Sequence, residues 1–252
     1  MKILFDSKGL QAFHHLYDKK RLCSLITELI LLDFDVRFSN NNSLNLDLLS
    51  QYDILIITTR KPNPNFQFKD LEMESIHNFV NNGGGLLLMT NHADCVELNN
   101  NSDLTINDSH LAEKFDVVIE KTWFENKHRI NNLTIIYNNS FNNEHPIIKG
   151  ISVINKVNTI TINNCSSIKP SNDIEIIIKI PREMKDYRNN NNRNEENIFA
   201  CSLELNNGRA FFITDSGFIG SEGTKYPGPG LINYGDNNKF ILNTIKWLGR
   251  EL

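Results

Sequence analysis

The chain has few cysteines, and their spacing excludes two common uses of this residue. Four cysteines stand at positions 23, 95, 165 and 201 of 252 residues, and no two of them form a CxxC pair. Zinc sites and small disulfide-rich domains need closely spaced or numerous cysteines. The sequence therefore predicts reduced thiols, most of them buried, and neither a metal site nor a disulfide framework.

Long apolar runs and a strong charge of either sign are also missing. No window approaches the ~18 apolar residues of a membrane span, and the short apolar run before Asp6 is too brief for a signal peptide. The net charge is -4 and the pI is about 6.0, with no run of Lys or Arg. Such a chain has no general attraction to nucleic acid or anionic lipid. We expect a cytosolic protein that binds neither nucleic acid nor membranes.

The first half of the sequence alternates between strand and helix patterns. Apolar runs at 3–5, 53–57 and 86–89 are typical of strands buried on both faces, and 35–38 continues the series. Between them, 22–30 and 70–81 carry apolar residues at helical spacing, and 44–49 indicates a short helix. Strand–helix–strand units with short connections favour parallel pairing. The pattern predicts an α/β, flavodoxin-like domain with helices on both faces of a central, mostly parallel sheet.

The second half is richer in strands. The segments 116–119, 133–137, 151–162, 174–180 and 198–205 are β-rich and separated by turn signals, which indicates antiparallel additions to the parallel core. A last core strand at 209–214 precedes a final helix that Asp236 can cap. The polar stretch Arg188–Asn197 is interpreted as a loop without chemistry. We expect one domain over residues 1–252.

Three segments together resemble the class I glutamine amidotransferase-like superfamily. They are "FVNNGGGLLLMTNH" at 79–92, "HPIIKGI" at 145–151, and "GRAFFITDSGFIG" at 208–220 followed by "DNNKFILNTIKWL" at 236–248. The resemblance is to its branches without amidotransferase activity, including ThuA-like proteins and the N-terminal domain of an intraflagellar-transport subunit. It implies the amidotransferase-like α/β fold over most of the chain. We expect no cofactor.

The chain departs from that superfamily at its catalytic residues. Amidotransferases of this class carry a cysteine on a Gly-x-Cys-x-Gly elbow, which favours the reactive thiolate. Counted from Gly85, that position falls near Asn91 or His92, and Cys95 comes later without flanking glycines. The His-Pro-Glu partner motif is replaced by Asp215-Ser216-Gly217. The sequence predicts that glutamine is not hydrolysed by the usual dyad.

Polar residues follow several of the predicted parallel strands, where open α/β sheets bind their ligands. We expect them to converge on one edge of the sheet. The ligand-binding candidates are Asp6, Ser7, Thr59, Arg60, Asn91, Ser216 and Tyr226, the last on the Gly/Pro-rich loop 220–230; the catalytic candidates are His92, Asp94 and Asp215.

Each candidate also has a plain structural interpretation. Asp6-Ser7 and Asp215-Ser216 can be strand-ending turns, and Arg60 can be a surface residue instead of a partner for a carboxylate or phosphate. His92 with Asp94 and Asp215 can supply a general base and an orienting carboxylate, or three ligands for a divalent cation; the plain interpretation of His92 is a hydrogen-bonded turn histidine. No metal-ligand spacing such as His-x-x-x-His supports a metal at these residues.

Three functions are compatible with this pattern. The leading hypothesis is a divergent amidotransferase-like domain without the Cys–His dyad, which binds a small polar ligand or a protein partner. The alternatives are a hydrolase of a carbohydrate or nucleotide that uses His92, Asp94 and Asp215, and a structural subunit of a larger assembly. Self-association into a homo-oligomer is left open.

Overall fold

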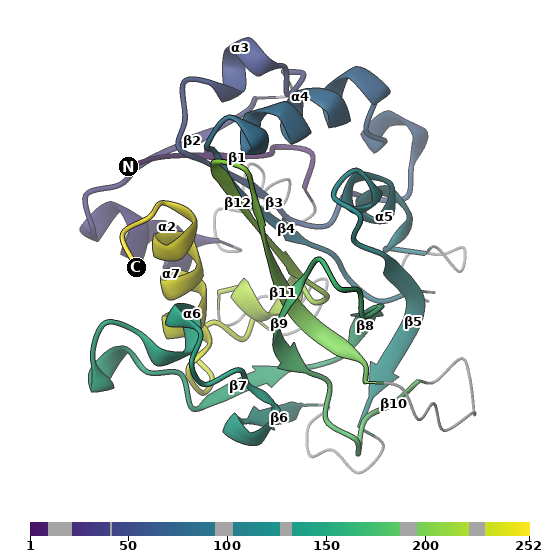
Figure 1. Ribbon diagram of the computed structural model, residues 1–252, viewed down its shortest axis with the longest axis vertical. Helices are drawn as coiled ribbons and strands as arrows, with labels where there is room; N and C mark the ends of the chain where they lie inside the picture. Colours follow the sequence, from purple (N-terminus) through teal and green to yellow (C-terminus); the bar gives the residue numbers. More distant parts are fainter. Residues whose placement is uncertain (10–21, 41, 94–102, 127–132, 187–195, 222–229) are drawn as a thin grey trace.

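The fold centres on one large mixed sheet (Figure 1). The computed structural model describes residues 1–9, 22–40, 42–93, 103–126, 133–186, 196–221 and 230–252. Within them, ten strands join in the order β10-β5-β8-β11-β12-β4-β3-β1-β2, and β9 pairs with β11. The parallel half consists of β2 (Asp35–Phe38), β1 (Lys2–Phe5), β3 (Ile54–Ile57), β4 (Gly85–Met89) and β12 (Gly208–Ile213). The predicted parallel core is confirmed.

The strands beyond β12 are antiparallel, as the second half of the sequence predicts. They are β11 (Ile198–Leu205), β9 (Glu175–Lys179), β8 (Cys165–Ile168), β5 (Ile119–Glu125) and β10 (Lys185–Asp186). A separate two-stranded sheet pairs β6 (Thr134–Tyr137) with β7 (Thr159–Ile162).

Two expected strands have different bounds. The strand expected at 116–119 starts only at Ile119, because Val117 closes the end of the preceding helix through a backbone bond to Ala112. The β-rich segment 151–162 contains a 3-10 turn, η4 (Val153–Asn155), so its strand begins at Thr159. Apolar residues in a β-rich segment predict a buried strand. Those at 151–154 are exposed and belong to no strand.

Helices cover both faces of the parallel half, as expected. The helices α2 (Cys23–Leu31) and α7 (Asn237–Leu248) pack on one face, and α3 (Leu46–Leu49), α4 (Asp70–Asn81) and α5 (Ile106–Glu113) pack on the other. Side chains of a strand point alternately to its two faces. In β4, Leu87 and Met89 accordingly join the core under α2 and α7, whereas Leu86 and Leu88 join the core under α4. None of the helices in the described ranges is both long and apolar enough to cross a bilayer.

The glycine run after α4 ends the helix, as its position before a strand predicts. Gly83 adopts a left-handed backbone with φ 112°, and Gly84 N–H bonds the carbonyl oxygen of Phe79. The same turn lies against β12, where a Cβ on Gly208 would stand 1.8 Å from the carbonyl oxygen of Val80. Glycine at 208 therefore lets α4 approach the sheet closely.

Candidate functional site

The carboxyl ends of β1, β3, β4 and β12 lie side by side at one edge of the sheet, because these four strands are parallel neighbours. Backbone pairing continues past the strand ends, since Asp6 N–H bonds the Ile56 carbonyl over 2.9 Å and Thr90 N–H bonds the Ile213 carbonyl over 2.8 Å. The candidates that follow these strands therefore lie at one edge, which we call the carboxyl edge. They are Asp6, Ser7, Thr59, Arg60, Asn91, His92, Asp215 and Ser216. Asp94 and Tyr226 lie outside the described residues.

A hydrogen-bonded cluster joins three of these strand ends. The Thr59 hydroxyl donates to Ser216 Oγ over 2.9 Å, and the Asn91 amide donates to the same oxygen over 3.3 Å. Asn91 also accepts, through Oδ1, the backbone N–H of His92 over 2.8 Å. All four residues are buried. The cluster ties the turns after β3, β4 and β12 to one another.

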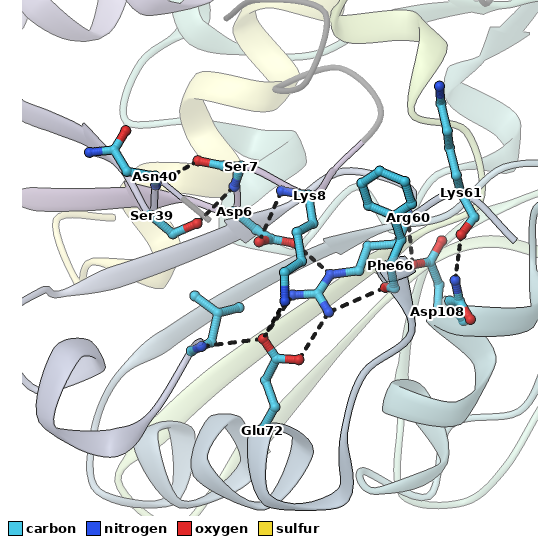
Figure 2. Close-up of polar contacts among 12 residues, drawn as sticks. Asp6, Ser7, Lys8, Ser39, Asn40, Arg60, Lys61, Phe66, Glu72 and Asp108 are labelled. Carbon is cyan, nitrogen blue, oxygen red and sulfur yellow. Dashed lines mark hydrogen bonds and ion pairs between the residues drawn. The ribbon is translucent and has the colours of Figure 1, made fainter. Parts of the chain in front are cut away.

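A second network, of charged groups, lies at the ends of β1 and β3 (Figure 2). The Arg60 guanidinium bonds Asp6 Oδ2 through Nε over 2.7 Å and reaches both carboxylate oxygens of Glu72 over 3.1 and 3.2 Å. It also stacks on the Phe68 ring, 3.6 Å from the ring centre. Arg60 is fully buried, which corrects the alternative that it lies on the surface. Its positive charge is neutralised inside the protein.

Glu72 is the member of this network that the sequence interpretation missed. Burial alone would raise the pKa of its carboxyl, but the hydrogen bond and charge of Arg60 outweigh burial, and the pKa is lowered. Lys8 adds a second cation, 3.6 Å from Glu72 Oε1. A signal was present, because Glu72 lies four residues before Ile76 and so on the apolar stripe of the helix. An acidic residue at such a position needs a buried partner.

Asp108, on α5, is another buried carboxyl that was not predicted. Its Oδ1 accepts the backbone N–H of Arg60 over 3.2 Å. Burial raises the pKa of this carboxyl well above its usual range. Burial therefore favours the neutral form of this carboxyl beside the Arg60 network.

Ser7 ties two strands together. Its N–H donates to Ser39 Oγ over 2.9 Å, and its own Oγ accepts the backbone N–H of Asn40 over 2.8 Å (Figure 2). These bonds link the ends of β1 and β2. The plain interpretation of Ser7, a residue that ends a strand in a turn, accounts for both of its bonds.

His92 is held by its ring on two sides. Nδ1 lies 3.0 Å from the carbonyl oxygen of Ala93, and the ring stacks on Trp123 with 4.3 Å between ring centres. A carbonyl can only accept a hydrogen bond, so Nδ1 is the donor in this contact. The contact and the stacking together fix the orientation of the ring.

Asp215 combines a structural bond with an unusual titration. Its Oδ1 accepts the backbone N–H of Gly217 over 2.6 Å, which closes a turn after β12. Burial raises the pKa of its carboxyl to about 7, although nearby backbone N–H groups, that of Gly217 above all, oppose the rise. Its Oδ2 is buried without a hydrogen bond among the described residues. Such a carboxyl can give or take a proton near neutral pH.

The two buried thiols in the described part of the chain, Cys165 and Cys201, are poor nucleophiles at neutral pH. Burial raises the pKa of both Cys165 and Cys201, so each is protonated. Cys23 is exposed, and Cys95 lies outside the described residues. Within the described ranges, no group of three or more His, Cys, Asp or Glu side chains could hold a metal ion.

Comparison with known proteins gives a fold and no family. No family model matches the sequence, and no curated protein matches it. Among solved structures, the mmIFT52 N-terminal domain superposes with a TM-score of 0.67 at 12% identity, over 98% of this chain and 97% of that one. The chain has the fold of that domain. The resemblance inferred from the three sequence segments is confirmed at the level of fold.

Two bacterial structures agree with this result. A cytoplasmic protein from Salmonella typhimurium LT2 gives a TM-score of 0.61 at 14% identity, covering 98% of this chain and 99% of that one. A ThuA-like protein from Bacteroides uniformis gives 0.58 at 13% identity, covering 98% and 90%. Identities this low carry no activity from one protein to another.

Proposed function

We propose that this chain is a divergent amidotransferase-like domain that lacks the Cys–His dyad and binds a small polar ligand at the carboxyl edge. The observation that carries the proposal is the gathering of buried polar side chains from neighbouring parallel strands, with Thr59, Asn91 and Ser216 bonded to one another. Open α/β sheets bind ligands at this edge. The oxygen Oδ2 of Asp215, which has no hydrogen bond among the described residues, is a further group that a ligand can satisfy.

The charges at the carboxyl edge favour a neutral ligand. Arg60 and Lys8 are paired with the carboxylates of Asp6 and Glu72, so the network has no net positive charge with which to bind a phosphate. Hydroxyl and amide groups such as those of Thr59 and Asn91 bind neutral hydroxyl-rich molecules through hydrogen bonds. A sugar or another polyol therefore fits the edge better than a phosphorylated compound. The protein is proposed to act in the cytosol.

The test is a thermal-shift screen of neutral polyols, amino acids and nucleotides, followed by calorimetric titration of the compounds that stabilise the protein. Thr59→Val removes the hydroxyl that bonds Ser216, and Thr244→Val is its matched control, because Thr244 is equally buried in α7 and its hydroxyl bonds Phe240. A neutral ligand should bind the wild type and Thr244→Val alike and Thr59→Val at least about tenfold more weakly. Preference for phosphorylated compounds, or equal binding by both variants, contradicts the proposal.

A hydrolase is a second candidate, because Asp215 has a carboxyl that titrates at about pH 7 at the same edge as His92. In this alternative His92 or Asp215 exchanges a proton with a carbohydrate or nucleotide substrate, with Asp94 as a further candidate. Turnover of glycosides, esters or nucleotides that falls in both His92→Ala and Asp215→Asn supports it. Unchanged turnover in these variants removes the assignment.

A further inference from the structure

The segment between α6 (Pro146–Lys149) and β7 displays three aliphatic side chains to solvent. Ile151, Val153 and Ile154 are 68%, 89% and 81% exposed. Single exposed apolar residues are ordinary on protein surfaces. Three large apolar residues exposed within four positions are unusual, because the residues before and after this segment include buried apolar ones. We call residues 149–156 the 149–156 loop.

The 149–156 loop is held in one shape from inside the protein. The buried amide of Asn243 on α7 donates to the carbonyl of Ile147 over 2.8 Å and to that of Asn155 over 2.9 Å. Just past the loop, Val157 N–H bonds the Ile148 carbonyl over 2.9 Å. These bonds hold the two ends of the loop together, so its apolar residues 151–154 stand on a base of fixed geometry.

The sequence motif HPIIKGI builds this base. His145 caps α6 through Nδ1, which accepts the Ile147 N–H over 3.2 Å. Gly150 ends the helix with φ 65°, and a Cβ there would lie 2.7 Å from the carbonyl group of Asn155. A side chain at 150 is therefore excluded both by the backbone and by space. The motif turns the chain sharply so that the next residues project outward.

The charged residues of the 149–156 loop itself are both lysines. Lys149 and Lys156 flank its apolar residues, and residues 145–158 contain no Asp or Glu, in a chain whose net charge is -4. Lys149 lies 3.7 Å from Glu144, but both side chains are well exposed, so that pair is weak. A second copy of the loop placed across a twofold axis would set lysines against lysines. A different protein with carboxylates around an apolar groove is complementary.

We propose that the 149–156 loop is a docking site for a partner protein, which receives Ile151, Val153 and Ile154 in an apolar groove bordered by acidic residues. A loop already held in its bound shape loses little conformational entropy when it binds. The central aliphatic side chains supply most of the affinity, and the lysines supply orientation and a faster association. This site is separate from the carboxyl edge, and the proposal does not depend on a ligand there.

The experiment places a photo-crosslinking amino acid at Val153 in the full chain, in the cells that produce it, with Leu71 as the control position. Leu71 is 78% exposed on α4, remote in sequence from the loop. The partner identified from Val153 adducts is then purified, and its affinity is measured for the wild type, for Ile151→Ser/Val153→Ser/Ile154→Ser, and for Leu31→Ser/Leu71→Ser. Capture alone does not support the proposal; the affinities do.

We expect one partner protein to form a crosslink with the photo-reactive residue at Val153 and none with that at Leu71. The loop triple variant should bind it at least about tenfold more weakly, the Leu31/Leu71 variant should bind it as the wild type does, and added salt should weaken wild-type binding. Lys149→Glu/Lys156→Glu should reverse the sign of the salt effect. Adducts with a second copy of the chain or with lipid, no adduct beyond the control, or an unchanged affinity of the triple variant would each overturn it.

Discussion

Arg60 donates from Nε to Asp6 Oδ2 over 2.7 Å, and neither side chain reaches solvent. The bond joins the turn after β1 to the turn after β3, so two residues that the sequence offers as ligand contacts bind each other. Glu72 completes the neutralisation from α4. An internal ion network therefore joins the strand ends at the carboxyl edge, and the ligand that we propose would meet mainly hydroxyl and amide groups there.

The first prediction concerns this network. Arg60→Met leaves Asp6 and Glu72 buried with only Lys8 as a cation nearby, and it should lower the free energy of unfolding by ~3–5 kcal/mol. Urea denaturation measures it. Arg37→Met is the matched control, because Arg37 pairs with Asp35 over 2.7 Å at the surface, where such pairs contribute at most ~1 kcal/mol.

Removing all three charges should restore stability. Asp6→Asn/Arg60→Met/Glu72→Gln leaves only Lys8, which is partly exposed, without an ionic partner, and it should be clearly more stable than Arg60→Met alone. If Arg60→Met costs no more than Arg37→Met, the buried network does not hold the carboxyl edge together.

The second prediction follows from Asp215, whose pKa burial raises from 3.8 to about 7. The folded protein binds this proton more tightly than the unfolded chain, so the contribution of Asp215 to stability is present below about pH 4 and is lost as pH rises through 7. Asp215→Asn keeps the Oδ1 acceptor for Gly217 and removes the titration. Relative to the wild type, it should gain up to about 4 kcal/mol of unfolding free energy between pH 4 and pH 8. A stability difference that is constant over this range would show that Asp215 is ionised throughout.

The third prediction concerns His145, whose pKa is lowered by folding, whereas that of Asp215 is raised. Burial lowers the pKa of its ring from 6.5 to about 4, and the charge of Arg209 adds to the effect. Its contribution to stability is therefore present above pH 6.5 and is lost as pH falls through 4. His145→Asn retains a cap acceptor for α6 but does not titrate. Denaturation between pH 4 and pH 7 should show a shallower loss of stability at acid pH in this variant, and an identical slope would contradict the assignment.

The fourth prediction distinguishes the thiols. Cys165 and Cys201 are buried and protonated, whereas Cys23 is exposed. Iodoacetamide added to the native protein at pH 7.5 should alkylate Cys23 long before the two buried residues, and unfolding in urea should equalise the rates. Peptide mass spectrometry resolves each position. Rapid native alkylation of Cys165 would show a reactive thiol near the carboxyl edge.

Much of the sheet could be predicted from the sequence, because β1, β3 and β4 are largely apolar runs that alternate with helices carrying one apolar stripe. The convergence of Thr59, Asn91 and Ser216 on one edge follows from that topology. The bonds among them do not, because they depend on how the turns continue beyond the strands.

Other features needed contacts that are distant in sequence. The Glu72–Arg60 pair joins a helix to a turn, and Ser7 bonds the end of β2. Glu72 on an apolar helical stripe was a usable signal for a buried ion pair. The apolar segment 151–154 was a misleading signal. Its composition indicates a strand, but Gly150 turns the chain so that the segment lies at the surface.

The most direct test of the central claim is to follow the backbone amide resonances of the protein by NMR while a neutral polyol selected by thermal shift is added. The account predicts the largest shifts at Thr59, Asn91 and Ser216, with saturation in step with the calorimetric affinity. Shifts confined to the cavity of about 580 Å³ at the opposite edge, lined among others by Tyr52, Phe79 and Leu248, would contradict it.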